Sequence, residues 1–78
     1  MAEEKEHGDD FMGVYYILED YADTVEKMID VTHASEDAVV RGFEGLESRG
    51  LINAIRRDGK IESVKVTEKG FELYSKGY

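Results

Sequence analysis

Few side chains in this chain have a type and spacing suited to catalysis or metal binding. His7 and His33 are the only histidines, and no spacing such as His-x-x-x-His joins them. Residues 9–10 and 19–20 are acidic pairs, but both lie near expected helix ends, where capping and solvation account for them. The sequence contains neither a Gly-rich phosphate loop nor a nucleophile motif. We therefore expect a protein that is not an enzyme and that holds no metal or cofactor.

The chemistry left to the chain is ionic. Arg56, Arg57 and Lys60 surround an Asp-Gly pair, and Lys65 follows five residues later. Guanidinium and ammonium groups gathered in this way can bind phosphate oxygens. An Asp-Gly turn also favours charged, solvated neighbours for structural reasons alone. The sequence admits both interpretations of these cations.

Charge is unevenly distributed along the chain, whose net charge is −8. Residues 1–49 contain 14 acidic and 4 basic side chains, a net charge of −10, whereas residues 50–78 contain 4 acidic and 6 basic ones, a net charge of +2. A nucleic-acid-binding domain is usually basic overall. The acidic excess is typical of a solubility surface or of a proteome adapted to a salty cytoplasm.

The length of 78 residues predicts one small domain. The absence of cysteine excludes disulfides and fits a reducing cytoplasm. No apolar stretch approaches the roughly 20 residues that span a bilayer, and the charged N-terminus has no signal-peptide core. We expect a cytoplasmic protein that makes no membrane contact, with a disordered acidic tail at residues 1–8 and one domain at residues 9–78.

Three helices are expected in the first two-thirds of the domain. The first covers residues 10–21, and its apolar face is formed by Val14, Ile17, Leu18 and Tyr21. The second starts after residue 23 or 24, where Asp23 and Glu26 have the spacing of a capping box. The third covers residues 36–49, with Ser35 as its N-cap and Gly50 as its stop. Its buried face is formed by Val39, Phe43 and Leu46.

A β-hairpin and a last helix are expected after Gly50. Residues 51–56 and 61–67 have strand character, and the Asp58-Gly59 pair between them favours a two-residue turn. Thr67 then has the position of an N-cap for a helix over residues 68–76, which can bury Phe71 and either Tyr74 or Leu73 against the hairpin. The sequence thus predicts an α+β fold: a three-helix bundle, a two-stranded hairpin and a short C-terminal helix.

The first helix has more apolar surface than a three-helix core of this size needs. Phe11, Met12, Tyr15 and Tyr16 cannot all reach the core. Some of them can lie flat on the surface or pack under the last helix. The alternative is a homodimer interface formed by these four residues.

The chain from Thr24 to Leu73 resembles the winged helix-turn-helix domains of transcription regulators, most closely small regulators of the PadR and MarR sort. Residues 24–29 with residues 35–46 look like the helix-turn-helix pair. Leu46, Gly50, Leu51 and Ile52 look like the join between the third helix and the wing, and the run Thr67-Glu68-Lys69-Gly70 is similar to one that follows the wing in many such proteins.

The resemblance implies that the third helix enters the major groove of DNA and that the hairpin, the wing, touches phosphates or the minor groove. The matching positions on the third helix are Glu36, Asp37, Val40, Arg41 and Glu44. Only Arg41 is cationic, and it can equally pair with a carboxylate four residues before it or three after it. The residues expected to contact DNA are Arg41, Arg56, Arg57, Lys60, Val40 and Lys65.

Two classes of function follow from these patterns. The first is a small DNA-binding transcription regulator, dimeric, which contacts duplex DNA with the third helix and the basic wing. The second is a protein-protein interaction module that keeps the winged-helix frame and turns its acidic helix toward a basic protein partner. The resemblance favours the first class, and the charge distribution favours the second.

Overall fold

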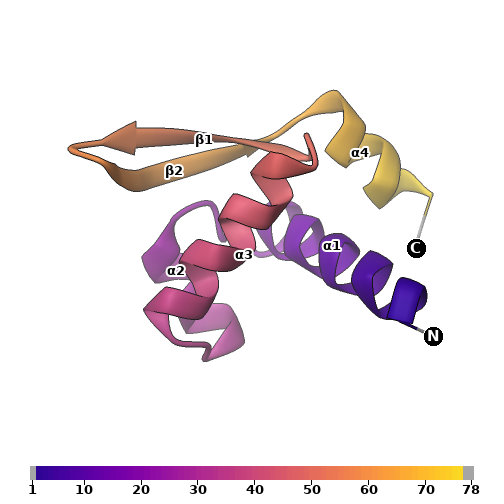
Figure 1. Ribbon diagram of the computed structural model, residues 1–78, viewed down its shortest axis with the longest axis horizontal. Coiled ribbons are helices and arrows are strands. Elements are labelled where there is room, and N and C mark those ends of the chain that lie inside the picture. The colour runs from indigo at the N-terminus through magenta and orange to yellow at the C-terminus, as the bar shows by residue number, and fades with distance from the viewer. Residues whose placement is uncertain (1, 77–78) are drawn as a thin grey trace.

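The computed structural model describes the backbone of residues 2–76 and the side chains of residues 10–76. The elements are α1 (Ala2–Glu19), α2 (Val25–Thr32), α3 (Glu36–Ser48), β1 (Ile52–Arg57), β2 (Lys60–Val66) and α4 (Glu68–Ser75) (Figure 1). The expected α+β fold and the order α-α-α-β-β-α are confirmed. In the described part of the chain, no helix combines the length and the apolar character needed to cross a membrane.

The hairpin lies along one side of α2 and α3 and extends beyond them to its turn, while α4 lies beside α1 at the other end of the molecule (Figure 1). A single core joins these elements. Its buried residues are Val14, Ile17, Ala22, Met28, Val39, Phe43, Leu46, Leu51, Ile52 and Val64. The buried face expected for the third helix is therefore confirmed.

Three helices begin at side-chain caps that satisfy their first free N–H groups. Ser35 Oγ accepts a hydrogen bond from the amide of Ala38, and Thr67 Oγ1 accepts one from Gly70, as the sequence predicted. Thr24 caps α2 in the same way, by accepting from the amide of Lys27. The capping box predicted for Asp23 is wrong, because the N-cap is Thr24. The backbone carbonyl of Asp23 accepts instead from the amide of Val64 and so joins the start of α2 to β2.

The bounds of α1 differ from the expected ones. The helix begins at Ala2, because the residues before Asp10 are mostly good helix formers and none is proline. Met1 and the side chains of residues 2–9 lie outside the described part, so the acidic tail at residues 1–8 stays a prediction. The helix ends before Tyr21, which has a left-handed φ of 57° and is 75% exposed. The placement of Tyr21 in the core was therefore wrong.

The hairpin turn is formed by Asp58 and Gly59, which have φ values of 54° and 78°. Positive φ at both central residues is the geometry that an Asp-Gly pair favours, as expected. The antiparallel register pairs Ile52 with Val66 and Ala54 with Val64. A bulge follows Ile55, so that Arg56 pairs with Ile61 and Glu62 is the extra residue.

The run Thr67-Glu68-Lys69-Gly70 fastens α4 to the junction between α3 and β1. Thr67 Oγ1 donates to the carbonyl of Gly50 at 2.6 Å, and Lys69 Nζ donates to the carbonyl of Arg49 at 3.1 Å. A Cβ on Gly70 would clash with the carbonyl oxygen of Leu51. Three residues of this run therefore have a structural role that explains their types.

Helix α4 packs against α1 and β2, and its apolar residues are less buried than expected. Leu73 and Tyr74 are half-buried against the core, but Phe71 is 51% exposed. The prediction that Phe71 is buried against the hairpin is wrong. The start of the helix is fixed by the hydrogen bond from Thr67 Oγ1 to the carbonyl of Gly50.

Candidate nucleic-acid interface

The outward face of α3 carries the residues that sequence reasoning placed in the DNA groove. Glu36, Asp37, Arg41 and Glu44 are exposed, whereas Val40 is half-buried. The guanidinium of Arg41 donates to Asp37 Oδ2, one turn earlier on the same face. This hydrogen bond raises the pKa of Arg41. The one cation of this face is thus paired with a carboxylate of its own helix.

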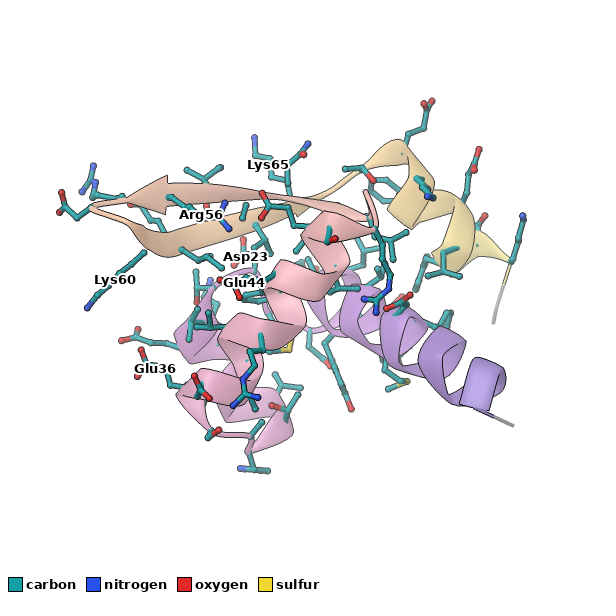
Figure 2. The ribbon with its side chains drawn as sticks, viewed as in Figure 1. Asp23, Glu36, Glu44, Arg56, Lys60 and Lys65 are labelled. Atoms are coloured by element: carbon teal, nitrogen blue, oxygen red, sulfur yellow. The ribbon has the colours of Figure 1, made fainter. Side chains whose placement is uncertain are left out.

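Arg56 is not at the free tip of the hairpin, which corrects the expected position. Its side chain lies on the same face of β1 as Ile52 and Ala54 and points toward α3 (Figure 2), where it forms a two-bond ion pair with Glu47. Arg56 Nη2 lies 2.8 Å from Glu47 Oε1, and Arg56 Nη1 lies 3.1 Å from Glu47 Oε2. The second oxygen also accepts from the amide of Ala54 at 3.4 Å. Glu47 therefore clamps α3 to β1, and its hydrogen bond from Arg56 lowers the pKa of Glu47.

The other cations of the hairpin are more accessible. Arg57 Nε lies 3.8 Å from Glu62 Oε1, with three-quarters of the Arg57 side chain exposed. Lys60 and Lys65 are exposed and form no ion pair with any side chain in residues 10–76. Lys60 extends on the α3 side of the hairpin, and Lys65 projects from the opposite face (Figure 2). The structure thus brings Lys60 to the side of the expected reading face and keeps Lys65 away from it.

A cleft of about 320 Å³ separates α2 and α3 from the hairpin, and we call it the α3–hairpin cleft. Its apolar floor comes from Val25, Ile29, Val40 and Ile61. Its charged rim comes from Glu26, Glu36, Glu44, Arg56 and Lys60. Sequence reasoning did not foresee this cleft, because the bulge that brings Ile61 to the α3 side of the hairpin has no signature in the sequence.

The four residues expected at a dimer interface are divided between two surfaces. Phe11 stacks on Tyr74 of α4 with ring centroids 6.2 Å apart, and Tyr15 approaches the same ring at 6.4 Å. Met12 and Tyr16 instead line an open groove between α1 and α3, together with Gly42 and Gly45. Met12 and Tyr15 stay more than a third exposed. Helix α4 thus covers part of the aromatic surface of α1, which agrees with the interpretation that some of these residues pack under the last helix.

The arginines of the molecule are held in ion pairs. Arg41, Arg56 and Arg57 each have a carboxylate partner, and Arg49 pairs with Asp10 at 3.3 Å. In the part of the chain described by the structure, no group of three potential metal ligands comes together.

Searches against protein-family models, curated proteins and solved structures found no significant match to the chain.

Proposed function

We propose that this chain is a winged helix-turn-helix domain of a small transcription regulator, and that it binds duplex DNA with α3 and the β1–β2 hairpin. The observation that carries this proposal is the arrangement of α3. It follows α2 after a three-residue connection, leaves its N-terminal half uncovered and has the hairpin beside it. A second helix presented in this way fits the major groove.

Each element has a definite role in this proposal. The N-terminal half of α3 enters the major groove, where Val40 and Arg41 reach base edges. The hairpin lies along the neighbouring backbone, where Arg57 and Lys60 contact phosphates. His33, with φ of 60°, forms the left-handed turn between α2 and α3, and Ser35 fixes the first turn of α3. Arg56 stays bound to Glu47 and positions the hairpin.

Intramolecular pairing of the arginines does not prevent phosphate contact. Arg41 and Arg57 are three-quarters exposed, and an ion pair between exposed side chains contributes little to stability. A phosphate group can therefore replace Asp37 or Glu62 as the partner of either guanidinium. Glu36 and Glu44 oppose binding, so we expect modest affinity that depends steeply on salt. A second copy, joined through the exposed part of the α1 aromatic surface, would double the cationic footprint.

The first test is a shift assay at low salt, with the DNA adjacent to the protein's own reading frame. Three phosphate contacts, from Arg41, Arg57 and Lys60, predict a slope of log affinity against log salt of about −3 per domain. Arg57→Glu should abolish binding, whereas the matched charge reversal Lys76→Glu, on α4, should have little effect. Absence of binding to mixed duplex at low salt would refute the proposal.

The expected homodimer needs its own measurement. Sedimentation of the protein at several concentrations should show a dimer, and Met12→Glu should shift the equilibrium toward the monomer because a charge cannot be buried unpaired. A monomer at the highest concentration would contradict the dimer without bearing on DNA binding.

A second candidate function is that of a protein-protein interaction module, and one observation favours it. Glu36 and Glu44 form no ion pair within the described side chains, residues 10–76, although they lie on the face expected to meet phosphates. An uncompensated acidic face is suited to a basic protein partner.

A further inference from the structure

The stripe of α3 that borders the α3–hairpin cleft alternates charge and apolar surface. Glu36, Val40 and Glu44 are four residues apart, so they lie one above the other on the same face of the helix. The two carboxylates are exposed, and Val40 between them is half-buried. Glu36 and Glu44 both lie on the side of α3 that the hairpin overhangs (Figure 2). The stripe reads acidic, apolar, acidic over about 12 Å of helix.

The opposite wall of the cleft continues this pattern. Val25 and Ile29 of α2 and Ile61 of β2 are half-buried, and they leave apolar surface open between the elements. Glu26 of α2 adds a third carboxylate to the rim. The chain's own described side chains leave about 320 Å³ of this space unfilled. The cleft therefore offers an apolar floor under an acidic rim.

The charge of the rim selects the ligand. Hydrogen bonding to Glu47 satisfies Arg56 and raises its pKa, with the charge of Glu44 adding to the effect. Because Arg56 is paired, Lys60 is the one cation of the rim that has no ion-pair partner among residues 10–76. It shares the rim with the carboxylates of Glu26, Glu36 and Glu44. A net negative rim above an apolar floor suits a lysine or arginine side chain, whose aliphatic stem packs on apolar surface while its charged end reaches an anion.

We propose that the α3–hairpin cleft binds a basic segment of a partner protein. The segment presents two cations with an apolar residue between them, and it meets Glu36, Val40 and Glu44 in that order. In an extended peptide, side chains two residues apart lie on one face and four residues span about 13 Å. A segment of the form cation-x-apolar-x-cation therefore matches the stripe in both charge and spacing.

This site does not depend on the proposed DNA binding, but the two ligands exclude each other. In the proposed complex, α3 lies in the major groove and the hairpin lies along the neighbouring DNA backbone. That backbone must therefore pass across the rim of the cleft between α3 and the hairpin. A basic segment occupying the cleft blocks that path. The protein partner would thus release the regulator from DNA.

The test uses the full chain and a synthetic peptide, Gly-Lys-Ala-Val-Ala-Lys-Gly with blocked ends. NMR titration at low salt should move the amide signals of Glu36, Val40, Glu44 and Gly59. The same peptide with both lysines acetylated should not bind, because acetylation removes the charge. A second control places the lysines three residues apart, on opposite faces of the extended chain, and should bind more weakly.

Variants of the protein separate this site from a DNA site. Glu36→Gln and Glu44→Gln should each weaken peptide binding about two- to fivefold, while the control Glu72→Gln on α4 should not. Lys60→Gln should tighten peptide binding, because it removes a competing cation, and should weaken duplex binding.

Several results would overturn the proposal. One is that the acetylated peptide binds as tightly as the unmodified peptide, and another is that the double variant Glu36→Gln/Glu44→Gln binds the peptide as tightly as the unmodified protein. A third is that the amide signals that move all lie on other surfaces, and a fourth is that duplex DNA binds this face while the peptide does not. Because the titration contains no DNA, failure of the regulator proposal leaves its result intact.

Discussion

The ion pair between Arg56 and Glu47 shows how a residue suited to one role is used in another. Arginine beside a hairpin turn is suited to phosphate contact, but here both ends of its guanidinium are bound by a carboxylate of α3. The same carboxylate accepts from the Ala54 amide and so shields the exposed edge of β1. Arg56 is therefore a structural residue, and the accessible cations of this surface are Arg41, Arg57 and Lys60.

The clamp predicts a specific dependence of stability on pH. The folded pKa of Glu47 lies below its ordinary value of 4.5, so the pair stabilises the fold fully above that pH. This contribution is lost as the pH falls through the lowered pKa. Urea unfolding of Glu47→Gln between pH 3 and 7 should show a flatter acid limb than the unmodified protein, whereas Glu72→Gln should not. Identical acid limbs for all three proteins would contradict the clamp.

Two glycines predict opposite effects of the same substitution. A Cβ at Gly70 would meet the Leu51 carbonyl oxygen and would lie 2.7 Å from Val66 Cγ1, so Gly70→Ala should destabilise the fold by about 1–3 kcal/mol. A Cβ at Gly42 would meet nothing within 4 Å, so Gly42→Ala should stabilise α3 by about 1 kcal/mol. Thermal unfolding of both variants provides the measurement. No other helix approaches position 42 closely enough to require a glycine there.

At the scale of elements, helix ends were largely predictable and chain reversals only in part. Ser35, Thr67 and Gly50 were found from sequence because capping depends on residue type and on neighbours within a few positions. His33, with φ of 60°, forms the left-handed turn in the three-residue connection between α2 and α3. Tyr21 was missed because a bulky aromatic residue is an unusual choice for such a position.

The end of α1 gives a prediction at this scale. The amide of Ala22 donates to the carbonyl of Tyr16, which requires the left-handed conformation that Tyr21 adopts. Because Tyr21 is largely exposed, Tyr21→Gly should remove backbone strain with little loss of packing and stabilise the protein by about 0.5–1 kcal/mol. Tyr21→Ala keeps the strain and should give no such gain. Denaturant unfolding of the two variants measures the difference.

The candidate site was less predictable than the fold. The family resemblance placed Val40 and Arg41 on one face of α3, where Arg41 is exposed and Val40 is half-buried. It placed Arg56 at the free tip of the hairpin, although strand alternation puts Arg56 on the same face of β1 as Ile52 and Ala54, the face toward α3. The contribution of Glu47 was also missed, since it depends on a contact between α3 and β1 that no local sequence pattern indicates.

For the whole molecule, salt is expected to have opposite effects on stability and on the proposed DNA binding. The net charge of −10 in residues 1–49 produces self-repulsion, which salt screens. We expect the melting temperature to rise with sodium chloride, while affinity for duplex falls over the same range. Replacing Glu19 and Asp20 by lysine should reduce the rise. A melting temperature that is independent of salt would show that repulsion does not limit stability.

The tie between α3 and β1 has a consequence for selectivity. Glu47 bridges the two walls between which any ligand of this face must fit, so their separation is fixed before the ligand arrives. A partner that is too wide or too narrow cannot be accommodated by a swing of the hairpin. Glu47→Ala removes this bridge and should therefore broaden the range of partners that bind. It should also lower the affinity for the best partner, because the distance between α3 and the hairpin would no longer be fixed before binding.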